Sequence, residues 1–187
     1  MKCKLKLVNA RIVLVILYLA LTFGVSISCS NKGKNDQKNS LPIEVYFSPG
    51  DDCAGKVVEL IKNSKNQILI QSYSFTSVPI ATALIEACKR NVEIMLIADE
   101  SRKPEKGSQI KKLKESGIAI FMDAPGDNKI AHNKVMILDN EIVITGSFNW
   151  TNAASKNVEN IVVIKDPKIA TVFKGQWESR RLVSKSI

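Results

Sequence analysis

A single histidine and a lysine two residues later are the residues in this chain best suited to chemistry. His132 is the only histidine among the 187 residues, and it precedes Lys134 in the sequence Ala-His-Asn-Lys-Val-Met-Ile-Leu-Asp. In an extended chain, side chains two residues apart project to the same side, so these two are expected to share a face. Imidazole can act as a nucleophile or a general acid, and an ammonium group can bind an anion. The pair therefore predicts chemistry on an anionic group.

A second polar pair follows a later apolar run. Ser147 and Asn149 stand two residues apart after Gly146, and Glu159 and Asn160 begin the next apolar run. Open α/β sheets often place ligand sites at the ends of their strands. These side chains are therefore expected to gather with the histidine and the lysine at one site.

Cleavage of a phosphodiester would use each of these side chain types. Imidazole can attack phosphorus, and Lys134, Asn149 and Ser147 can donate to the non-bridging oxygens that gain charge. Glu159 is a candidate to hold the second nitrogen of the His132 ring. The leaving oxygen needs a proton from another acid, and one histidine cannot easily serve both sides of one phosphorus. A twofold dimer would bring two copies of His132 to one phosphate.

Alternating elements should position these residues. The first half predicts strands separated by helices, the second half predicts consecutive strands, and Pro167 is expected to open a last helix. This pattern is typical of an α/β domain whose mixed β-sheet is flanked by helices. Strands are expected at 43–48, 67–73, 92–98, 118–122, 134–138, 141–145 and 160–164, and helices at 53–65, 78–90, 105–116 and 167–182.

The N-terminus resembles an export signal. Basic residues precede an apolar run over 12–25, which is shorter than the ~20 residues of a spanning helix. The run ends at Cys29 in a pattern similar to a bacterial lipoprotein cleavage site, although Ser26 stands where Leu is usual. We expect a lipoprotein-type signal peptide at 1–28, with lipidation at Cys29. Ordinary cleavage and an uncleaved anchor are the alternatives.

The following segment, 29–40, has no large apolar side chain after its cysteine and predicts a flexible polar tether. The catalytic domain is then expected at 41–187. The protein is expected to be exported to the cell envelope or periplasm, with a membrane tether through the lipid on Cys29.

Charge and cysteine content add little. The net charge is +9, but residues 41–187 hold 20 basic and 17 acidic residues, so bulk charge is weak support for a nucleic-acid partner. Cys53 and Cys88 could pair in an exported protein or stay as buried thiols. Neither has the spacing of a zinc site, and we expect no metal and no cofactor.

The motif His132-x-Lys134-x4-Asp139, followed by Gly146-Ser147-x-Asn149, resembles the signature of the phospholipase D superfamily. Tyr73-Ser74-Phe75-Thr76 and Glu159-Asn160 look like the small bacterial HKD endonucleases, which carry one motif per chain, act as homodimers and need no metal. The resemblance implies a phospholipase D-like fold. It also implies that His132 is nucleophile and acid, that Lys134 and Asn149 bind phosphate beside Ser147, and that Glu159 is the partner of the histidine. Asp139 is expected to be structural, because it lies at the far end of its strand.

Three functions follow from these expectations. The first is a metal-independent endonuclease that cleaves DNA, and also RNA, through a phosphohistidine at a homodimer interface. The second is a lipid phosphodiesterase of the phospholipase D or cardiolipin type, and the third is a nucleic-acid-binding module without catalysis. Phe148 and Trp150 could stack on a base or a lipid tail, or pack in the core. A lysine run at 111–114 could bind a phosphate backbone or form a solvated face.

Overall fold

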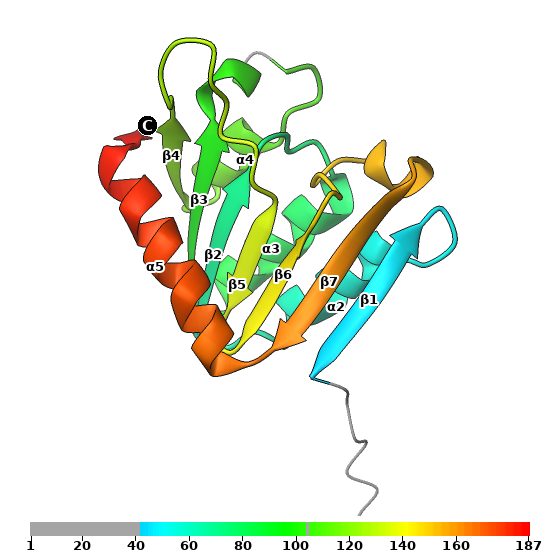
Figure 1. The fold of residues 1–187 in the computed structure, drawn as a ribbon. Helices are drawn as coiled ribbons and strands as arrows, with labels where there is room; N and C mark the ends of the chain where they lie inside the picture. Colours follow the sequence, from blue (N-terminus) through cyan, green and yellow to red (C-terminus); the bar gives the residue numbers. More distant parts are fainter. Residues whose placement is uncertain (1–41, 104) are drawn as a thin grey trace, which may run out of the picture. The chain divides into compact units, whose positions relative to one another are not determined.

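Eight strands form one sheet in the order β1-β7-β6-β5-β2-β3-β4-β8 (Figure 1). The computed structural model describes residues 42–103 and 105–187. The strands are β1 (Ile43–Ser48), β2 (Gln67–Ser72), β3 (Glu93–Asp99), β4 (Ala119–Asp123), β5 (Val135–Leu138), β6 (Ile142–Gly146), β7 (Glu159–Lys165) and β8 (Lys185–Ser186). The helices are α2 (Cys53–Asn63), α3 (Val78–Lys89), α4 (Ile110–Glu115) and α5 (Pro167–Val183), with short 3-10 turns η1 (Glu100–Arg102) and η2 (Ala154–Lys156).

The sheet is mixed, as the sequence predicted. Strands β2, β3 and β4 are parallel, because α3 and the segment containing α4 cross over between them. Strands β5, β6 and β7 follow one another as antiparallel neighbours, and β5 also pairs antiparallel with β2. The carboxyl ends of the parallel strands, the start of β5 and the end of β6 therefore meet at one edge of the sheet.

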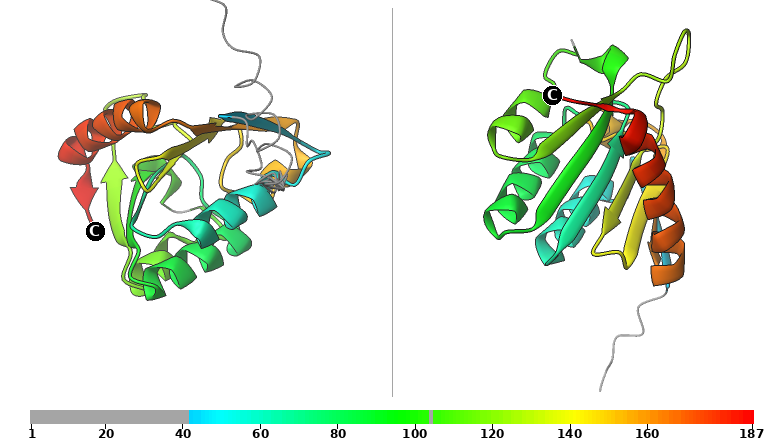
Figure 2. Two further views of the ribbon diagram at one scale, coloured as in Figure 1. Left: turned by 90° about the horizontal axis from the view of Figure 1, so that it is seen from below. Right: turned by 90° about the vertical axis from the view of Figure 1, so that its left-hand side faces the viewer.

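Helices cover both faces of the sheet. Helices α2, α3 and α4 lie on one face and α5 crosses the other (Figures 1 and 2). The larger core packs beneath α2–α4, whereas Trp177 of α5 anchors a smaller core on the opposite face, where its indole N–H donates to the Ile70 carbonyl at 2.9 Å. In Figure 1, α5 leaves β7 and β1 uncovered on its side of the sheet.

Side chains fix where the helices begin. The carboxylate of Asp52 accepts from the Gly55 N–H, and the hydroxyl of Ser77 accepts from Ile80. Asp166 caps α5 immediately before Pro167, which confirms the predicted start of the last helix.

The helix expected from Glu105 begins only at Ile110. Gly107 has a φ of +80°, which no right-handed helix accommodates, and the N–H of Gln109 donates to the Phe75 carbonyl at 2.9 Å. This bond holds residues 105–109 against the segment after β2, so the predicted first turns of the helix do not form. The local sequence of this region could not reveal that contact.

The expected signal peptide (1–28), lipidated Cys29 and tether (29–40) lie outside the described residues. Among the helices of the part that is described, none has the length and apolar character needed to cross a membrane. Cys53 and Cys88 are free thiols, so the alternative of a disulfide between them is not realised in this structure.

Candidate active site

The five residues predicted to be catalytic line one pocket at a single edge of the sheet. His132 precedes β5, Ser147 and Asn149 follow β6, and Glu159 is the first residue of β7. Strands β5, β6 and β7 are antiparallel neighbours, so these three strand ends lie side by side. We call this cavity the His132 pocket. It has a volume of about 430 Å³ and is lined by His132, Asn133, Lys134, Thr145, Gly146, Ser147, Asn149 and Glu159.

Lys134 is held rigidly beside the histidine. Its side chain is buried, and its ammonium donates to the main-chain carbonyl of His132 at 2.6 Å. Burial lowers the pKa of Lys134, and the negative charge of Glu159 opposes that shift. An ammonium in this position is little hydrated, which strengthens its attraction for an incoming anion.

Tyr73, which the sequence analysis did not single out as catalytic, contacts both His132 and Lys134. The rings of Tyr73 and His132 meet edge to face, with centroids 4.6 Å apart. The ammonium of Lys134 and the guanidinium of Arg102 each lie 5.2 Å from the Tyr73 ring centroid. An aromatic face attracts cations, so this ring is a common contact for the basic groups of the site. Its place directly after β2, at a strand end, was the signal that could have found it.

Ser147 and Asn160 lock the end of β6 to the start of β7. The hydroxyl of Ser147 accepts from the Asn160 N–H at 3.1 Å, and the Ser147 N–H donates to the Asn160 side chain at 3.2 Å. Gly146 makes this approach feasible: its φ is +154°, and a Cβ there would lie 2.2 Å from the Asn160 carbonyl oxygen. The glycine of the motif thus serves the geometry of the pocket.

Asn149 and Glu159 differ in their surroundings. The side-chain oxygen of Asn149 is buried and has no hydrogen-bond partner among the described residues. Glu159 accepts from the Asn157 side chain at 3.4 Å, and in the described part of the chain no hydrogen bond joins it to His132. The structure thus places Glu159 in the pocket near Lys134 without the predicted contact to the imidazole.

Asp99 holds the segment that carries the histidine. This buried carboxylate ends β3 and accepts from the N–H of Ala131, the residue before His132, at 2.5 Å. It also accepts from the Ser101 N–H at 3.0 Å. A negative charge buried at this point fixes two loops at once. The sequence pattern gave no sign of it beyond a strand end.

Asp139 lies at the opposite end of β5. Its carboxylate accepts from the N–H groups of Lys65, Asn66 and Gln67 at 2.8 to 2.9 Å. These bonds tie the turn after β5 to the connection between α2 and β2. The side chain is remote from the His132 pocket, as expected for a structural residue.

Burial decides one of the two alternatives that the sequence left open. Phe148 and Trp150 are both fully buried, so they pack in the core and neither presents a face to a base or a lipid tail. In the lysine run, Lys111 is 88% exposed and pairs with Glu115 at 3.8 Å. This exposure is compatible both with a solvated face and with binding of a phosphate backbone. Within residues 42–103 and 105–187, no group of three or more His, Cys, Asp or Glu side chains is placed to hold a metal ion.

The chain is similar to proteins of one family. Residues 57–180 match the family described as "Cardiolipin synthase, PLD-like domain". The chain is 37% identical over 147 residues to the phospholipase D of Rickettsia prowazekii, covering 78% of this chain and 70% of that protein. It is 32% identical over 133 residues to the mitochondrial cardiolipin hydrolase of Chlamydomonas reinhardtii, covering 71% and 59%.

Solved structures agree with these relatives. The fold matches that of a phospholipase D family member, Nuc from Salmonella typhimurium, with a TM-score of 0.73 and 36% identity. That match covers 78% of this chain and 97% of Nuc. NucT from Helicobacter pylori has the same fold, with a TM-score of 0.72 at 23% identity over 78% of this chain and 98% of that one. The predicted fold class is thereby confirmed.

Proposed function

The chain belongs to the phospholipase D superfamily and is a phosphodiesterase of that superfamily, and from this premise we propose that it is a metal-independent endonuclease acting on DNA and RNA. One observation carries the proposal: His132, Lys134, Ser147, Asn149 and Glu159 line a single open pocket. A phosphodiester could enter it with its charged oxygens toward Lys134 and Asn149.

The lining of the His132 pocket favours nucleic acid over lipid. Every side chain that lines this pocket carries a polar atom, and none is purely aliphatic or a phenyl group. A lipid phosphodiesterase would gain from an apolar slot beside the phosphate, because acyl chains are driven out of water. The match to nearly the whole length of Nuc points the same way.

A lipid phosphodiesterase is the second candidate. It is favoured by the relatives that are named phospholipase D and mitochondrial cardiolipin hydrolase. Both substrate classes present the same phosphodiester to the same residues. The difference must therefore lie in the groups beside the phosphate.

The proposed reaction proceeds in two displacements. One ring nitrogen of His132 attacks phosphorus, the bond from phosphorus to the leaving oxygen breaks, and a protonated His132 from the second subunit gives its proton to that oxygen. Water then attacks the phosphohistidine, its proton passes to the second imidazole, and the bond from phosphorus to nitrogen breaks. Lys134 and the amide of Asn149 stabilise the charge on the non-bridging oxygens in both steps.

An exposed apolar face supports the required dimer. On the face that α5 leaves uncovered, Ile43, Val45 and Phe47 of β1 are 53%, 47% and 58% exposed. On α5 itself, Ile169 and Val172 are 38% and 69% exposed. We propose that α5 of one subunit packs on β1 and β7 of its partner and the reverse, which is a self-complementary twofold contact. The face reaches Asn160, which pairs with Phe47 in the sheet beside the His132 pocket.

The direct test is cleavage of plasmid DNA by purified residues 41–187 in excess EDTA. We expect the wild-type domain to nick the plasmid, and His132→Ala to reduce the rate by about a thousandfold or more, since the nucleophile is lost. Loss of wild-type activity in EDTA would refute the metal-free mechanism. Parallel assays on RNA and on cardiolipin vesicles, with the same protein batch, separate the two substrate classes.

A further inference from the structure

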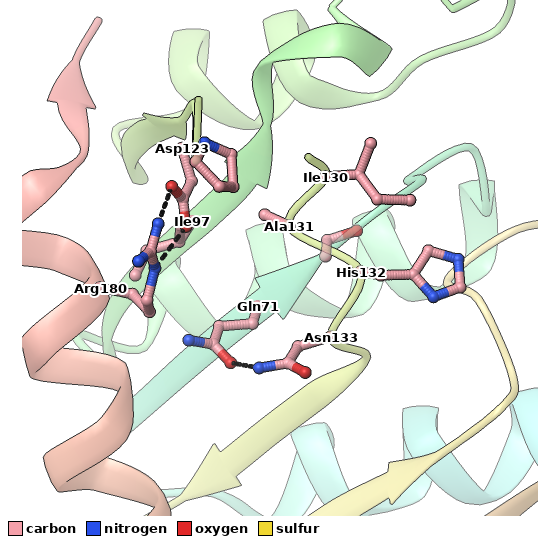
Figure 3. A pocket seen from close by; sticks show the side chains of 10 residues that line it. Gln71, Ile97, Asp123, Ile130, Ala131, His132, Asn133 and Arg180 are labelled. Atoms are coloured by element: carbon pink, nitrogen blue, oxygen red, sulfur yellow. Dashed lines mark hydrogen bonds and ion pairs between the residues drawn. The ribbon is translucent and has the colours of Figure 1, made fainter. Parts of the chain in front are cut away.

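A second cavity adjoins the His132 pocket on the α5 side of the sheet. It has a volume of about 220 Å³, and His132 and Asn133 line both cavities. We call it the Gln71 pocket (Figure 3). It is lined by Gln71, Ser72, Ile97, Asp123, Pro125, Ile130, Ala131, His132, Asn133 and Arg180. Because the two cavities adjoin, a group attached to a phosphate at His132 could extend directly into the Gln71 pocket.

Two amides form one wall of the Gln71 pocket. The side-chain N–H of Asn133 donates to the side-chain oxygen of Gln71 at 2.9 Å, and the two amides face each other in Figure 3. Gln71 is only 6% exposed, and among the described residues its side chain makes one hydrogen bond, in which its oxygen accepts from Asn133. The pair therefore keeps one NH2 group and one carbonyl oxygen for a bound molecule, whichever way round the amides lie.

The remaining walls are an ion pair and aliphatic groups. The guanidinium of Arg180 on α5 binds the buried carboxylate of Asp123, with Nε donating at 2.9 Å. This pair neutralises the charge at that end of the pocket. Ile97, Pro125 and Ile130 supply apolar surface. The pocket thus combines apolar surface with a donor and an acceptor that lie next to each other.

We propose that the Gln71 pocket binds a nucleobase, that of a nucleotide flanking the scissile phosphodiester. A base has two apolar faces and an edge on which donors and acceptors alternate, which matches the aliphatic wall and the amide pair. An acyl chain fits poorly, because it would bury the free N–H of Gln71 without a partner. The inference rests on the proposed nuclease function and specifies the substrate class of that site.

The test compares two chromogenic diesters that release the same p-nitrophenolate. One is the p-nitrophenyl ester of thymidine 5′-phosphate, and the other is bis(p-nitrophenyl) phosphate, which has no base. The ratio of their kcat/KM values measures what the nucleoside contributes relative to a nitrophenyl ring, which lacks the donor and acceptor edge of a base. We expect Gln71→Leu to lower this ratio about tenfold relative to the wild-type protein, because one hydrogen-bonded edge is lost.

Two further variants make the result specific. Gln71→Glu keeps the oxygen that accepts from Asn133 but replaces the N–H donors, so the ratio should fall as for Leu. The added charge acts on both phosphates and cancels in the ratio. Gln109→Leu changes the same side-chain type in the α4 segment, outside the Gln71 pocket, and should leave the ratio unchanged.

Several results would overturn the subsite. If the Gln71 variants lose kcat/KM equally on both diesters, Gln71 serves to position the His132 segment. If their ratio equals that of the wild-type protein, the Gln71 pocket does not bind the base. Conversion of Gln71→Leu to a monomer would assign the pocket to the subunit interface. The nuclease proposal fails separately, if the wild-type protein hydrolyses bis(p-nitrophenyl) phosphate but cleaves neither DNA nor RNA.

Discussion

At the scale of single residues, the site brings basic side chains together before any phosphate is bound. Lys134 is buried, His132 lies beside it, and Arg102 lies on the same Tyr73 ring. The negative face of the Tyr73 ring offsets part of the repulsion between the charges of Lys134 and Arg102. Tyr73 is therefore expected to keep Lys134 protonated and the imidazole in place, although it need not touch the substrate.

Replacement of Tyr73 tests this positioning role through the pH profile. Burial already lowers the pKa of Lys134, so loss of the ring in Tyr73→Leu should lower that pKa further. Because the neutral amine binds phosphate weakly, activity is lost as pH rises through this pKa. We expect the alkaline limb of kcat/KM to move to lower pH in Tyr73→Leu.

Tyr73→Phe is the matched control, because it keeps the ring face and removes only the hydroxyl. Its alkaline limb should stay where the wild-type limb is. Other charged groups facing this ring and lysine are Glu159 at the start of β7, and Asp99, Arg102 and Glu105 around the end of β3. If the alkaline limbs of kcat/KM coincide in Tyr73→Leu and Tyr73→Phe, the Tyr73 ring acts only through packing and not on the pKa of Lys134.

At the scale of elements, connections far apart in sequence are tied by a few polar side chains. Asp139 joins the turn after β5 to the start of β2, and Asp99 joins the end of β3 to the segment before β5. Ser147 and Asn160 join β6 to β7. These bonds set the register in which the strand ends deliver their side chains to the His132 pocket.

Asp139→Ala should separate stability from chemistry. The substitution leaves three backbone N–H groups without their acceptor, which should cost about 2 kcal/mol or more of unfolding free energy. Urea denaturation monitored by circular dichroism measures this loss. The folded fraction should retain kcat within a few-fold, because the side chain lies at the other end of β5 from His132. A kcat loss as large as that of His132→Ala would contradict the structural role of Asp139.

At the scale of the whole molecule, the sheet is asymmetric in its covering. α2–α4 cover one face along its length, whereas α5 covers only part of the other (Figure 1). The uncovered part is apolar and runs along β1 and β7 toward the His132 pocket. Apolar patches rimmed by polar residues are typical of interaction surfaces. In the proposed dimer, a second copy of the chain covers this part of the sheet and also supplies the second acid.

Val45→Lys tests the dimer. A charge in the middle of this face should convert the domain to a monomer and abolish cleavage, since burying an unpaired ammonium is costly. Light scattering and plasmid nicking measure the two effects. Val78→Lys on α3, at 46% exposure close to the 47% of Val45 but on the opposite face, should change neither. A monomeric variant that retains full activity would contradict the dimeric mechanism.

Mixed dimers extend the same test. When His132→Ala and Lys134→Ala chains are combined, every composite site lacks at least one group, so full activity should not return. Recovery of the wild-type rate would mean that each subunit works alone. Vesicle binding by the wild-type domain that Val45→Lys abolishes, with no change in oligomeric state, would assign the face to a membrane instead.

The sequence by itself determined the phosphodiesterase family and most of the fold. The spacing of His132 and Lys134, the second pair at Ser147 and Asn149, and the alternation of strands and helices are local patterns. They depend on the two-residue period of a strand and on helix start signals such as Pro167. Both can be recognised from residues that are neighbours in the sequence. These patterns were sufficient to predict the mixed sheet and the edge at which the residues meet, and the resemblance of the motif to a known signature predicted the phosphodiesterase family.

Only the tertiary structure decided which other residues meet them. Gln71 on β2, Tyr73 directly after β2 and Asp99 at the end of β3 lie some 30 to 60 residues before His132 in the sequence. Their place near strand ends is a local signal, but no local pattern says which of them contacts the site. The same holds for the burial of Phe148 and Trp150 and for the late start of α4, which a bond from Gln109 to Phe75 enforces. Packing between distant segments fixed these features, because each depends on the free energy of the whole fold and not on the residues beside it.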